Sequence, residues 1–494
     1  MYTNRQIWDI SLPIFLSLLA QNVINITDTA FLGRVGEVAL GASAMGGLYY
    51  ICIFTVAFGF SAGSQIIIGR RNGERRYEAV GPVVLQGTLF LLVLAAVCFV
   101  ASRLWGERMM GVMVSSDELR RATMEYLDWR IYGFFFAFTS VMFRALFVGI
   151  TRTRVLTLAS VVMSVVNVVL DYLLIFGHAG LPRLGIAGAA IASVVAEAAS
   201  VLFLAVYTRL TVDRRRYGLD RLRRFDFRLI RQVLSISGFT MLQYFISMST
   251  YFIFFLAVER LGQRDLAVAN IARSLYIALF IPVSALSTAA NTMVSNLLGA
   301  GRTQEVIPLI RHLTLISVGI TALFAALLVL LPRLFLSVYT NEAELITASI
   351  PSVVVIALAS LSSAASSIAF SAITCRQSRE RLDHTRYSTE KTSKSTKCYE
   401  SSNDREVHCQ SWHLKLSSLL MSLLNLSYLL SLLQVCISTS LHILVSIQRS
   451  LNNICYRTFL LIAELVSLSK VISVKSTLDV CNELWKGTLT ESSL

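Results

Sequence analysis

Residues 155–177 read Val-Leu-Thr-Leu-Ala-Ser-Val-Val-Met-Ser-Val-Val-Asn-Val-Val-Leu-Asp-Tyr-Leu-Leu-Ile-Phe-Gly, an apolar stretch that is interrupted near its end by Asn167 and Asp171. A helix needs about 20 apolar residues to cross the hydrocarbon core of a bilayer, and this stretch has that length. A spacing of four residues puts Asn167 and Asp171 on one face of such a helix. The stretch therefore predicts a membrane-spanning helix with a polar, partly acidic face.

The rest of the chain has the same apolar character. Of its 494 residues, 55% are hydrophobic and 15% are charged, whereas soluble domains have about 25% charged residues. We therefore expect an all-α integral membrane protein rather than a soluble one. Ten stretches are long enough to span a bilayer: 7–32, 42–69, 80–104, 122–148, 155–177, 185–208, 229–258, 266–298, 306–331 and 344–374.

The distribution of arginine predicts the orientation of these spans. The connections that follow the second, fourth, sixth and eighth spans carry 17 Arg in total, whereas those that follow the odd-numbered spans carry 9. By the positive-inside rule, the N-terminus and the long connection 209–231 then lie in the cytoplasm of a multi-pass protein. The net charge of +14 is explained by the same loops, so we expect the lipid bilayer, and no nucleic acid, as a partner.

An internal repeat divides the chain. Phe58-Gly-Phe-Ser-Ala-Gly-Ser-Gln-Ile-Ile-Ile-Gly-Arg-Arg-Asn-Gly73 closes the second span, and a similar small-residue segment, 281–301, closes the eighth. Repeats of this kind are typical of transporter folds, in which substrate binds between the halves. The predicted parts are 1–208 with six spans, a basic linker 209–231, and 232–374 with four spans.

Composition changes abruptly after Thr374. Residues 1–374 hold 25 of the 26 Gly and all 7 Pro, whereas 375–494 hold 22 Ser and a single Gly. At the repeat distance of 227 residues, Val148-Gly149 should recur at 375–376, where the chain reads Cys375-Arg. A shift of one base lets codons for Cys-Arg-Gln-Ser-Arg-Glu read Val-Gly-Asn-Arg-Glu. We therefore predict that 375–494 is an atypical tail, read out of frame.

Two intramembrane carboxylates mark the candidate site. Charges near the bilayer centre are costly, so they usually serve a function. Asp28 lies five residues before Gly33, and Asp171 lies six before Gly177, so both are about 8–9 Å inside the end of their spans. Ser193, counted from Gly185, lies about 12 Å inside. Asp28, Asn167, Asp171 and Ser193 could thus meet at one level, where their oxygens suit Na⁺ or a proton; alternatively, they hold helices together by hydrogen bonds.

Four further polar residues could face the same space. Gln21 and Asn25 lie on the first span with Asp28, and Gln243 lies on the seventh. Glu197 lies one turn from Ser193 and either faces the cavity or pairs with an arginine. We interpret these four as possible lining residues, and for Gln243 a helix-contact role is the stronger interpretation.

The sequence resembles the multidrug and toxic compound extrusion (MATE) family of exporters over residues 1–374. The matching segments include Asp28-Thr-Ala-Phe-Leu-Gly-Arg-Val-Gly36, Gln65-Ile-Ile-Ile-Gly-Arg-Arg-Asn-Gly73 and Asn167-Val-Val-Leu-Asp171. The resemblance implies twelve helices in two six-helix lobes, of which about ten are clear here and the second lobe is incomplete. It also implies export of organic cations in exchange for Na⁺ or H⁺, with Asp28, Asn167 and Asp171 as the cation site and Ser193 where the family usually has Thr.

Three functional interpretations remain. The first is an antiporter for small-molecule cations, a monomer in the bacterial inner membrane, with no cofactor beyond its coupling ion. The second is a flippase for lipid-linked precursors, although a polyanionic cargo would call for a basic cavity rather than this acidic one. The third is a non-functional, frameshifted chain. No hydrolase or phosphate-loop motif occurs, so we do not expect an enzyme.

Overall fold

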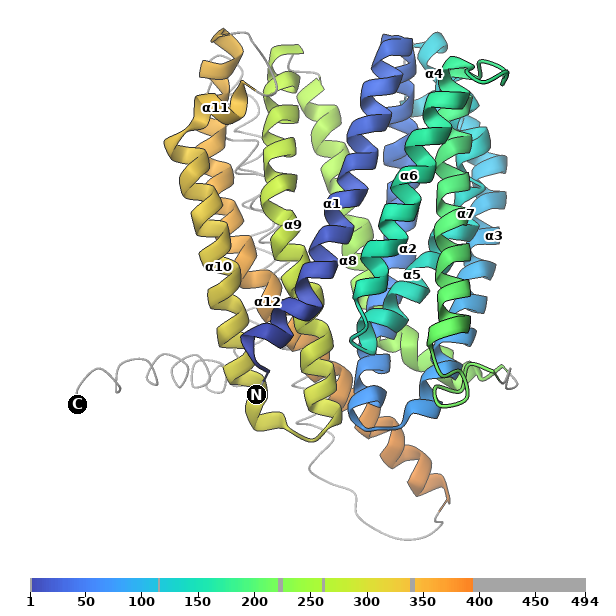
Figure 1. Cartoon of the computed structure of the whole chain (residues 1–494), viewed down its shortest axis with the longest axis vertical. Coiled ribbons are helices and arrows are strands. Elements are labelled where there is room, and N and C mark those ends of the chain that lie inside the picture. Colours follow the sequence, from blue (N-terminus) through green and yellow to red (C-terminus); the bar gives the residue numbers. More distant parts are fainter. Residues whose placement is uncertain (1, 114–115, 221–224, 260–262, 338–342, 394–494) are drawn as a thin grey trace, which may run out of the picture. The chain divides into compact units, whose positions relative to one another are not determined.

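The computed structural model describes residues 2–113, 116–220, 225–259, 263–337 and 343–393, and these form helices without a strand (Figure 1). Side chains are described throughout these ranges except at 112–113, 239, 250–267, 343, 373 and 376–393. The helices are α1 (Asn4–Val35), α2 (Glu37–Gly73), α3 (Val80–Met113), α4 (Asp117–Arg130), α5 (Gly133–Gly149), α6 (Arg154–Phe176), α7 (Gly185–Thr211), α8 (Phe227–Glu259), α9 (Gln263–Gly299), α10 (Val306–Leu330), α11 (Pro332–Leu336) and α12 (Ala343–Ser393), with short 3₁₀ turns at Tyr77–Ala79 and Thr303–Glu305.

The predicted all-α membrane fold is confirmed. Within the described ranges, eight helices are long and apolar enough to cross a membrane. The predicted span 122–148 is not one straight helix but the pair α4 and α5, bent by 53°. The predicted span 229–258 corresponds to α8, which is helical but is not among those eight. Each predicted span therefore coincides with a helix or with this bent pair.

A ladder of polar contacts fixes the register of α1 against α6. Pro13 lies inside α1, and because proline has no N–H, the carbonyl of Asp9 lacks its helical donor; Thr153 donates to that carbonyl instead, at 3.3 Å. Further contacts follow along both helices in the same direction: Thr157 to the Pro13 carbonyl at 2.9 Å, Ser17 with Ser160 at 2.7 Å, and Ser164 to the Ala20 carbonyl at 3.2 Å. The two helices are therefore parallel, and two turns further on the register brings Asp28 to the level of Asp171.

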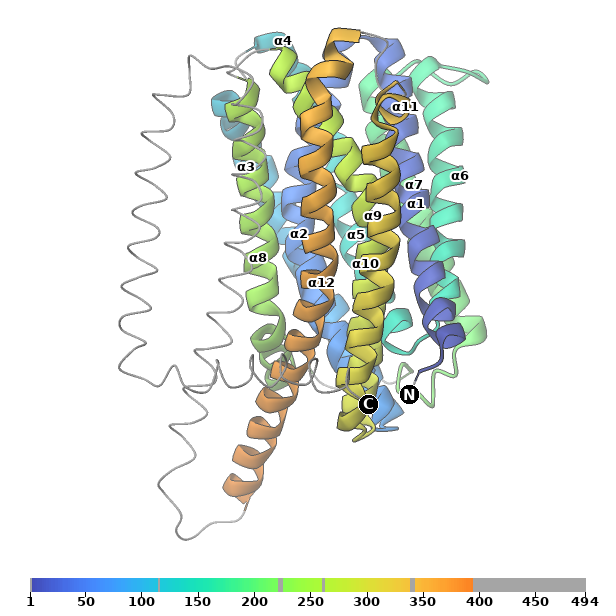
Figure 2. The same cartoon turned by 90° about the vertical axis from the view of Figure 1, so that its left-hand side faces the viewer.

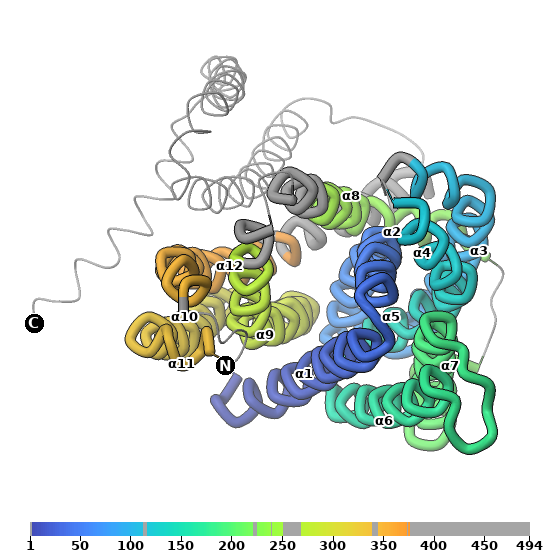
Figure 3. The backbone as a smooth tube through the Cα atoms, turned by 90° about the horizontal axis from the view of Figure 1, so that it is seen from above, coloured from blue at the N-terminus to red at the C-terminus, as the bar shows by residue number. Residues whose placement is uncertain are grey.

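The first half (α1–α7) meets the second half (α8–α12) along α2, which contacts both α8 and α9 (Figure 3). Gln65 Nε2 donates to Thr292 Oγ1 at 3.0 Å and to the Thr288 carbonyl at 3.2 Å. Asn72 Nδ2 donates to Asn296 Oδ1 at 2.7 Å. Gln65 and Thr292 are 227 residues apart, which is the repeat distance, so equivalent positions of the two repeats touch each other.

Glycines at the ends of α2 and α9 allow this close approach. A Cβ on Gly73 would lie 2.1 Å from the Asn296 carbonyl oxygen, and a Cβ on Gly299 would lie 2.1 Å from the Arg70 carbonyl oxygen. The two contacts are reciprocal, because each joins the final glycine of one helix to a residue three positions before the final glycine of the other. Reciprocal contacts are what a two-fold relation between repeats produces.

The predicted linker is attached to the first half rather than hanging free. The Gly81 N–H donates to the Tyr217 carbonyl at 2.8 Å, and the Tyr217 ring meets the Tyr77 ring edge-on at 5.6 Å. The Arg216 guanidinium lies 4.2 Å from the centre of the Tyr77 ring. Residues 212–219 thus cover the start of α3, and the described part of the linker has a fixed position.

Helix α12 runs past the predicted boundary at Thr374. It continues to Ser393 and extends beyond the neighbouring helix ends (Figure 2). The Cys375 side chain is buried, with its Sγ 3.3 Å from Ser295 Oγ. The remainder of the tail for which we predict an out-of-frame origin, 394–494, lies outside the described residues.

Candidate functional site

Asp28 and Asp171 face each other across the parallel helices α1 and α6. Their carboxyl groups lie close enough to interact directly, and the Asn167 amide is also within reach of Asp28. Asn167 and Asp171 share a face of α6, as the four-residue spacing predicts. The structure therefore brings together three of the four residues that the sequence places at one depth.

In this cluster Asn167 and Asp171 are buried and Asp28 is half-buried, and much of its hydrogen-bonding capacity is unused. Asn167 is 1% exposed and Asp171 is 0% exposed. Among the described residues, no hydrogen-bond partner is found for Asp28 Oδ1, for either terminal atom of Asn167, or for either oxygen of Asp171. Two carboxylates cannot hydrogen-bond to each other without a proton. Because buried polar groups are nearly always satisfied, these unpartnered atoms make the cluster a candidate binding site.

An apolar layer separates this cluster from the nearer helix ends. Leu32 lies one turn after Asp28, and Ile175 one turn after Asp171. Both belong to a buried cluster with Tyr126 of α4 and with Ile186 of α7, among others. Apolar surroundings strengthen the interaction of the carboxylates with any cation, because they lower the effective dielectric constant.

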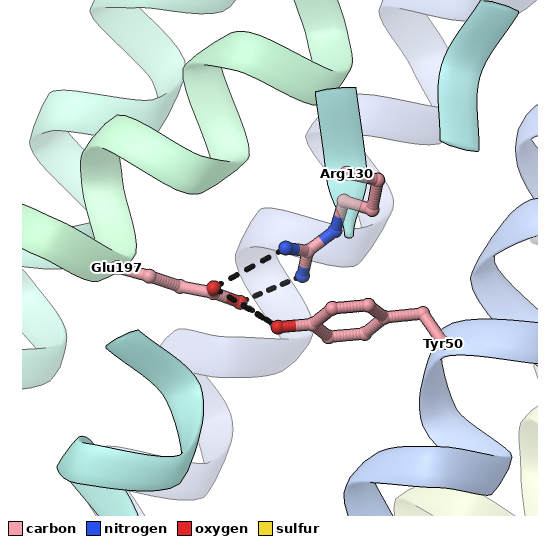
Figure 4. A network of polar contacts seen from close by, with 3 residues as sticks. All are labelled: Tyr50, Arg130 and Glu197. Atoms are coloured by element: carbon pink, nitrogen blue, oxygen red, sulfur yellow. Dashed lines mark hydrogen bonds and ion pairs between the residues drawn. The ribbon is translucent and has the colours of Figure 1, made fainter. Parts of the chain in front are cut away.

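Tyr50, Arg130 and Glu197 form a second polar network (Figure 4). Arg130, the last residue of α4, binds Glu197 of α7 through two contacts, Nη2 to Oε1 at 2.6 Å and Nη1 to Oε2 at 3.2 Å. The Tyr50 hydroxyl donates to the same carboxylate at 3.0 and 3.2 Å. The guanidinium carbon lies 3.6 Å from the centre of the Tyr50 ring. Helices α2, α4 and α7 are thereby joined by a largely buried, bidentate ion pair.

The bend between α4 and α5 provides the space for this network. A Cβ on Gly133 would lie 2.3 Å from Arg130 Nη1, 2.6 Å from Glu197 Oε2 and 2.9 Å from the Tyr50 hydroxyl. Any other residue at this position would push the ion pair apart. The predicted fourth span therefore bends between Arg130 and Gly133, next to this network.

The two polar groups influence each other. The charge of Arg130 acts on Asp28 as well as on Glu197. Tyr126, one turn before Arg130 on α4, interacts with Asp28, Arg130 and Glu197. One face of α4 thus carries both Arg130, which pairs with Glu197 of α7, and Tyr126, which belongs to the same buried cluster as Leu32 of α1.

The remaining predicted residues have more varied positions. Ser193 is half-buried on α7, and among the described residues it makes no hydrogen bond to the carboxyl pair. Of the possible lining residues, Gln21 is half-buried and Asn25 is exposed. Gln243 is buried on α8, and its Oε1 has no partner within the described ranges. Glu197 pairs with Arg130, which selects one of the two interpretations that the sequence leaves open.

The sequence analysis missed Arg130, Tyr50 and Tyr126. A signal for Arg130 was present, because it lies inside the predicted span 122–148, and an intramembrane arginine needs a partner. The spacing of Tyr126 and Arg130 by four residues also places them on one helix face. No comparable signal existed for Tyr50, since its role depends on how α2 packs against α4 and α7.

Comparison with known proteins identifies relatives in two ways. The MatE family model matches residues 13–173 and 240–377, which is more than half of the chain. A probable multidrug resistance protein NorM of Agrobacterium fabrum is 27% identical over 360 residues, covering 70% of this chain and 76% of the relative. The multidrug resistance protein NorM of Burkholderia vietnamiensis is 25% identical over 340 residues, covering 67% and 71%.

Solved structures share the fold. The crystal structure of a eukaryotic MATE transporter, AtDTX14, superposes with a TM-score of 0.69 at 18% identity, covering 77% of this chain and 83% of the other. A transporter of the MOP superfamily from Pyrococcus furiosus superposes with a TM-score of 0.66 at 19% identity, covering 89% and 95%. The match to the family model in both halves, together with this shared fold, shows that the chain is a membrane transporter of the MatE family, the multidrug and toxic compound extrusion family.

Proposed function

We propose that this protein is a secondary antiporter that exports small organic cations in exchange for Na⁺ or H⁺. The coupling ion would bind at Asp28, Asn167 and Asp171, and the Ser193 hydroxyl would approach as a further ligand from α7. The observation that carries this proposal is the set of buried carboxylate and amide atoms without hydrogen-bond partners among the described residues. Carboxylate and amide oxygens are suitable ligands for a hard cation.

The chemistry of coupling follows from the two facing carboxylates. Two negative charges in a buried site repel each other, so the pair retains a proton or a metal cation until the site opens to water. A cationic substrate is attracted to the same charges. The coupling ion and the substrate therefore compete, and entry of the ion down its gradient expels the substrate.

The relatives support the class of cargo. Their names describe multidrug resistance proteins, and the acidic cluster of this chain suits positively charged drugs better than the polyanionic head groups of a flippase. Gln21, Asn25 and Gln243 would line the route. We propose that the protein is a monomer in the bacterial inner membrane. Its N-terminus and the basic linker would lie in the cytoplasm, because arginine-rich connections are usually on that side.

Alternating access would use the contact between α2 and α9. In the state described, Gln65 with Thr292 and Asn72 with Asn296 join the halves near the arginine-rich ends of these helices. With the proposed orientation, this contact closes the cytoplasmic side. Transport then requires these hydrogen bonds to break so that the halves can rock apart there.

Neutralising the carboxylates tests the proposal. Asp171→Asn and Asp28→Asn should each abolish ion-driven efflux of ethidium from energised cells, because an amide has nearly the same shape but no charge. Ser193→Ala should weaken efflux less, since it removes one neutral ligand. The matched control is Asp128→Asn, which makes the same change at an exposed residue paired with Arg103 and should leave efflux unchanged, because such pairs contribute little.

Dye accumulation should be compared at equal amounts of protein in the membrane. Wild-type efflux by the double variant Asp28→Asn/Asp171→Asn would show that the pair only holds α1 against α6. Because the region after Thr374 is predicted to be out of frame, the measurement should be made both on this chain and on the gene with its frame restored. Efflux by the restored gene alone would identify the present chain as the non-functional form.

A further inference from the structure

The network of Tyr50, Arg130 and Glu197 has no role in the coupling scheme, although it is largely shielded from solvent and the charge of Arg130 acts on Asp28. The side chains of Arg130 and Glu197 are 11% and 15% exposed. An ion pair in such a position stabilises a membrane protein only weakly, because desolvation of both charges offsets their attraction. Its placement next to a cation site therefore suggests a function other than stability.

We propose that Glu197 is a positioning residue that holds the Arg130 guanidinium away from Asp28 and Asp171, and so keeps the carboxyl pair open to a mobile cation. The inference rests on the proposed function for the identity of that cation as the coupling ion. The arrangement of charges itself does not depend on it. Without Glu197, Arg130 would become an internal cation that occupies the site permanently.

The geometry shows how firmly the guanidinium is held. Glu197 contacts two of its nitrogens, at 2.6 and 3.2 Å, and the Tyr50 ring lies beneath it at 3.6 Å. The Tyr50 hydroxyl also donates to the carboxylate, which fixes the orientation of the carboxylate toward the arginine. A bidentate pair with an aromatic support confines an arginine much more than a single contact would.

Arg130 nevertheless has a second anionic partner within its influence. Its charge acts on Asp28, and Tyr126, one turn before Arg130 on α4, belongs to the same buried cluster as Leu32, one turn after Asp28 on α1. A tethered cation competes at a high effective concentration with ions from solution. Removal of Glu197 would therefore direct the arginine to Asp28, since an uncompensated buried charge moves to the nearest opposite charge that it can reach.

The charges in this region are consistent with this role. Asp28, Asp171 and Glu197 are three acids, and within the described part of the chain Arg130 is the one basic residue whose charge acts on Asp28. Pairing Arg130 with Glu197 leaves the charge of the two aspartates for an ion that can come and go. Glu197 thus determines that the site binds a mobile cation rather than an arginine.

Carbodiimide modification of Asp28 and Asp171 tests the inference directly. The reagent attacks protonated carboxyl groups in membrane proteins, and a bound guanidinium or metal ion prevents the attack. The full-length chain in membrane vesicles should be labelled and the modified peptides quantified by mass spectrometry. In Glu197→Gln the rate at both aspartates should fall by about tenfold or more, because a charge-assisted pair now occupies them.

Removing the arginine as well should reverse the effect. The double variant Arg130→Gln/Glu197→Gln should return to the wild-type rate, because no internal cation remains, and Glu197→Asp should label as wild type does. A purely structural role predicts the opposite, namely that the double variant is no better than the single one. Wild-type labelling of Glu197→Gln, or slow labelling of the double variant, would overturn the inference.

A second variant should release Arg130 from Glu197 without removing a charge. Gly133→Ala places a Cβ between Arg130 and Glu197, so it should part them and also slow the labelling of the aspartates. An unfolded chain would expose the aspartates and label faster, which is the opposite result and would count against the inference for either variant.

The outcome is separable from the proposed function. If neither added Na⁺ nor a lower pH changes the rate of carbodiimide labelling of Asp28 and Asp171 in the wild-type protein, the proposal that they bind the coupling ion fails. The difference between Glu197→Gln and the double variant would still show that Glu197 positions Arg130. Asp128→Asn, which breaks an exposed ion pair on the same helix, serves as the control and should label at the wild-type rate.

Discussion

Gly73→Ala should shift the protein away from the state in which α2 and α9 are joined. The added Cβ would lie 2.1 Å from the carbonyl oxygen of Asn296 and 2.9 Å from its carbonyl carbon. Both atoms belong to the backbone, so no side-chain rotation can relieve the clash. The ends of the two helices must separate by about an ångström to restore an ordinary contact distance.

The free-energy change follows from the contacts that this separation disturbs. Overpacking in a well-packed interface costs about 1–3 kcal/mol. Moving the helices apart also weakens the Asn72–Asn296 hydrogen bond, at 2.7 Å, which contributes about 0.5–1.5 kcal/mol. A total of about 1.5–4.5 kcal/mol against the joined state corresponds to a shift of its equilibrium by about tenfold to about 2,000-fold.

Thiol labelling measures this shift. Ser295 is 1% exposed and lies at the contact, with its Cβ 3.0 Å from where a Cβ on Gly69 would be. Ser295→Cys, in a background without the eight native cysteines, should react slowly in the joined state. Adding Gly73→Ala should speed its reaction with a hydrophilic maleimide in inside-out vesicles by a factor within the range above.

Gly47→Ala is the matched control, because Gly47 lies on the same helix and a Cβ there would meet nothing within 4 Å. It makes the same chemical change and should leave the rate unchanged. Equal labelling rates in the Gly73→Ala and Gly47→Ala proteins would refute the reasoning. It would mean that α2 and α9 adapt without separating, and that their contact does not control access.

Two further predictions concern orientation and the tail. A single cysteine at the exposed Asp220 should be shielded from an impermeant thiol reagent in intact cells, because the arginine-rich linker is expected in the cytoplasm. A single cysteine at the exposed Glu107 should react, and the reverse pattern would invert the proposed topology. The gene, read in the alternative frame after codon 374, should encode Val-Gly and then two more apolar spans, because the family match stops at residue 377. An alternative frame without apolar spans would show that 375–494 is the intended sequence.

Much of the fold was accessible from the sequence because it depends on local chain geometry. A helix rises by about 1.5 Å per residue, so counting from Gly33 and Gly177 sufficed to place Asp28 and Asp171 at one depth. The apolar length of each span likewise predicted the helices. The repeat distance predicted the relation between segments 58–73 and 281–301, whose glycines meet in the structure.

Other features depended on how the helices rotate and pack against one another, which apolar periodicity alone does not specify. Ser193 had a suitable depth but makes no hydrogen bond to the carboxyl pair among the described residues. Helix α12 continues to Ser393, although composition changes at Thr374, because helix formation does not need the glycine and alanine that membrane packing favours.

The partner of Glu197 illustrates the difference between what the sequence determines and what only the tertiary structure determines. The sequence predicted that Glu197 either faces a cavity or pairs with an arginine, and it could not choose between these, because Arg130 is 67 residues away. Only the tertiary structure decided for the arginine, by bending the fourth span at Gly133 and stacking Tyr50 against the guanidinium. The sequence determined which charges enter the membrane and at what depth, since helical rise is fixed. The packing of helices α1, α2, α4, α6 and α7 determined which of those charges meet, since contacts between distant segments depend on the whole bundle.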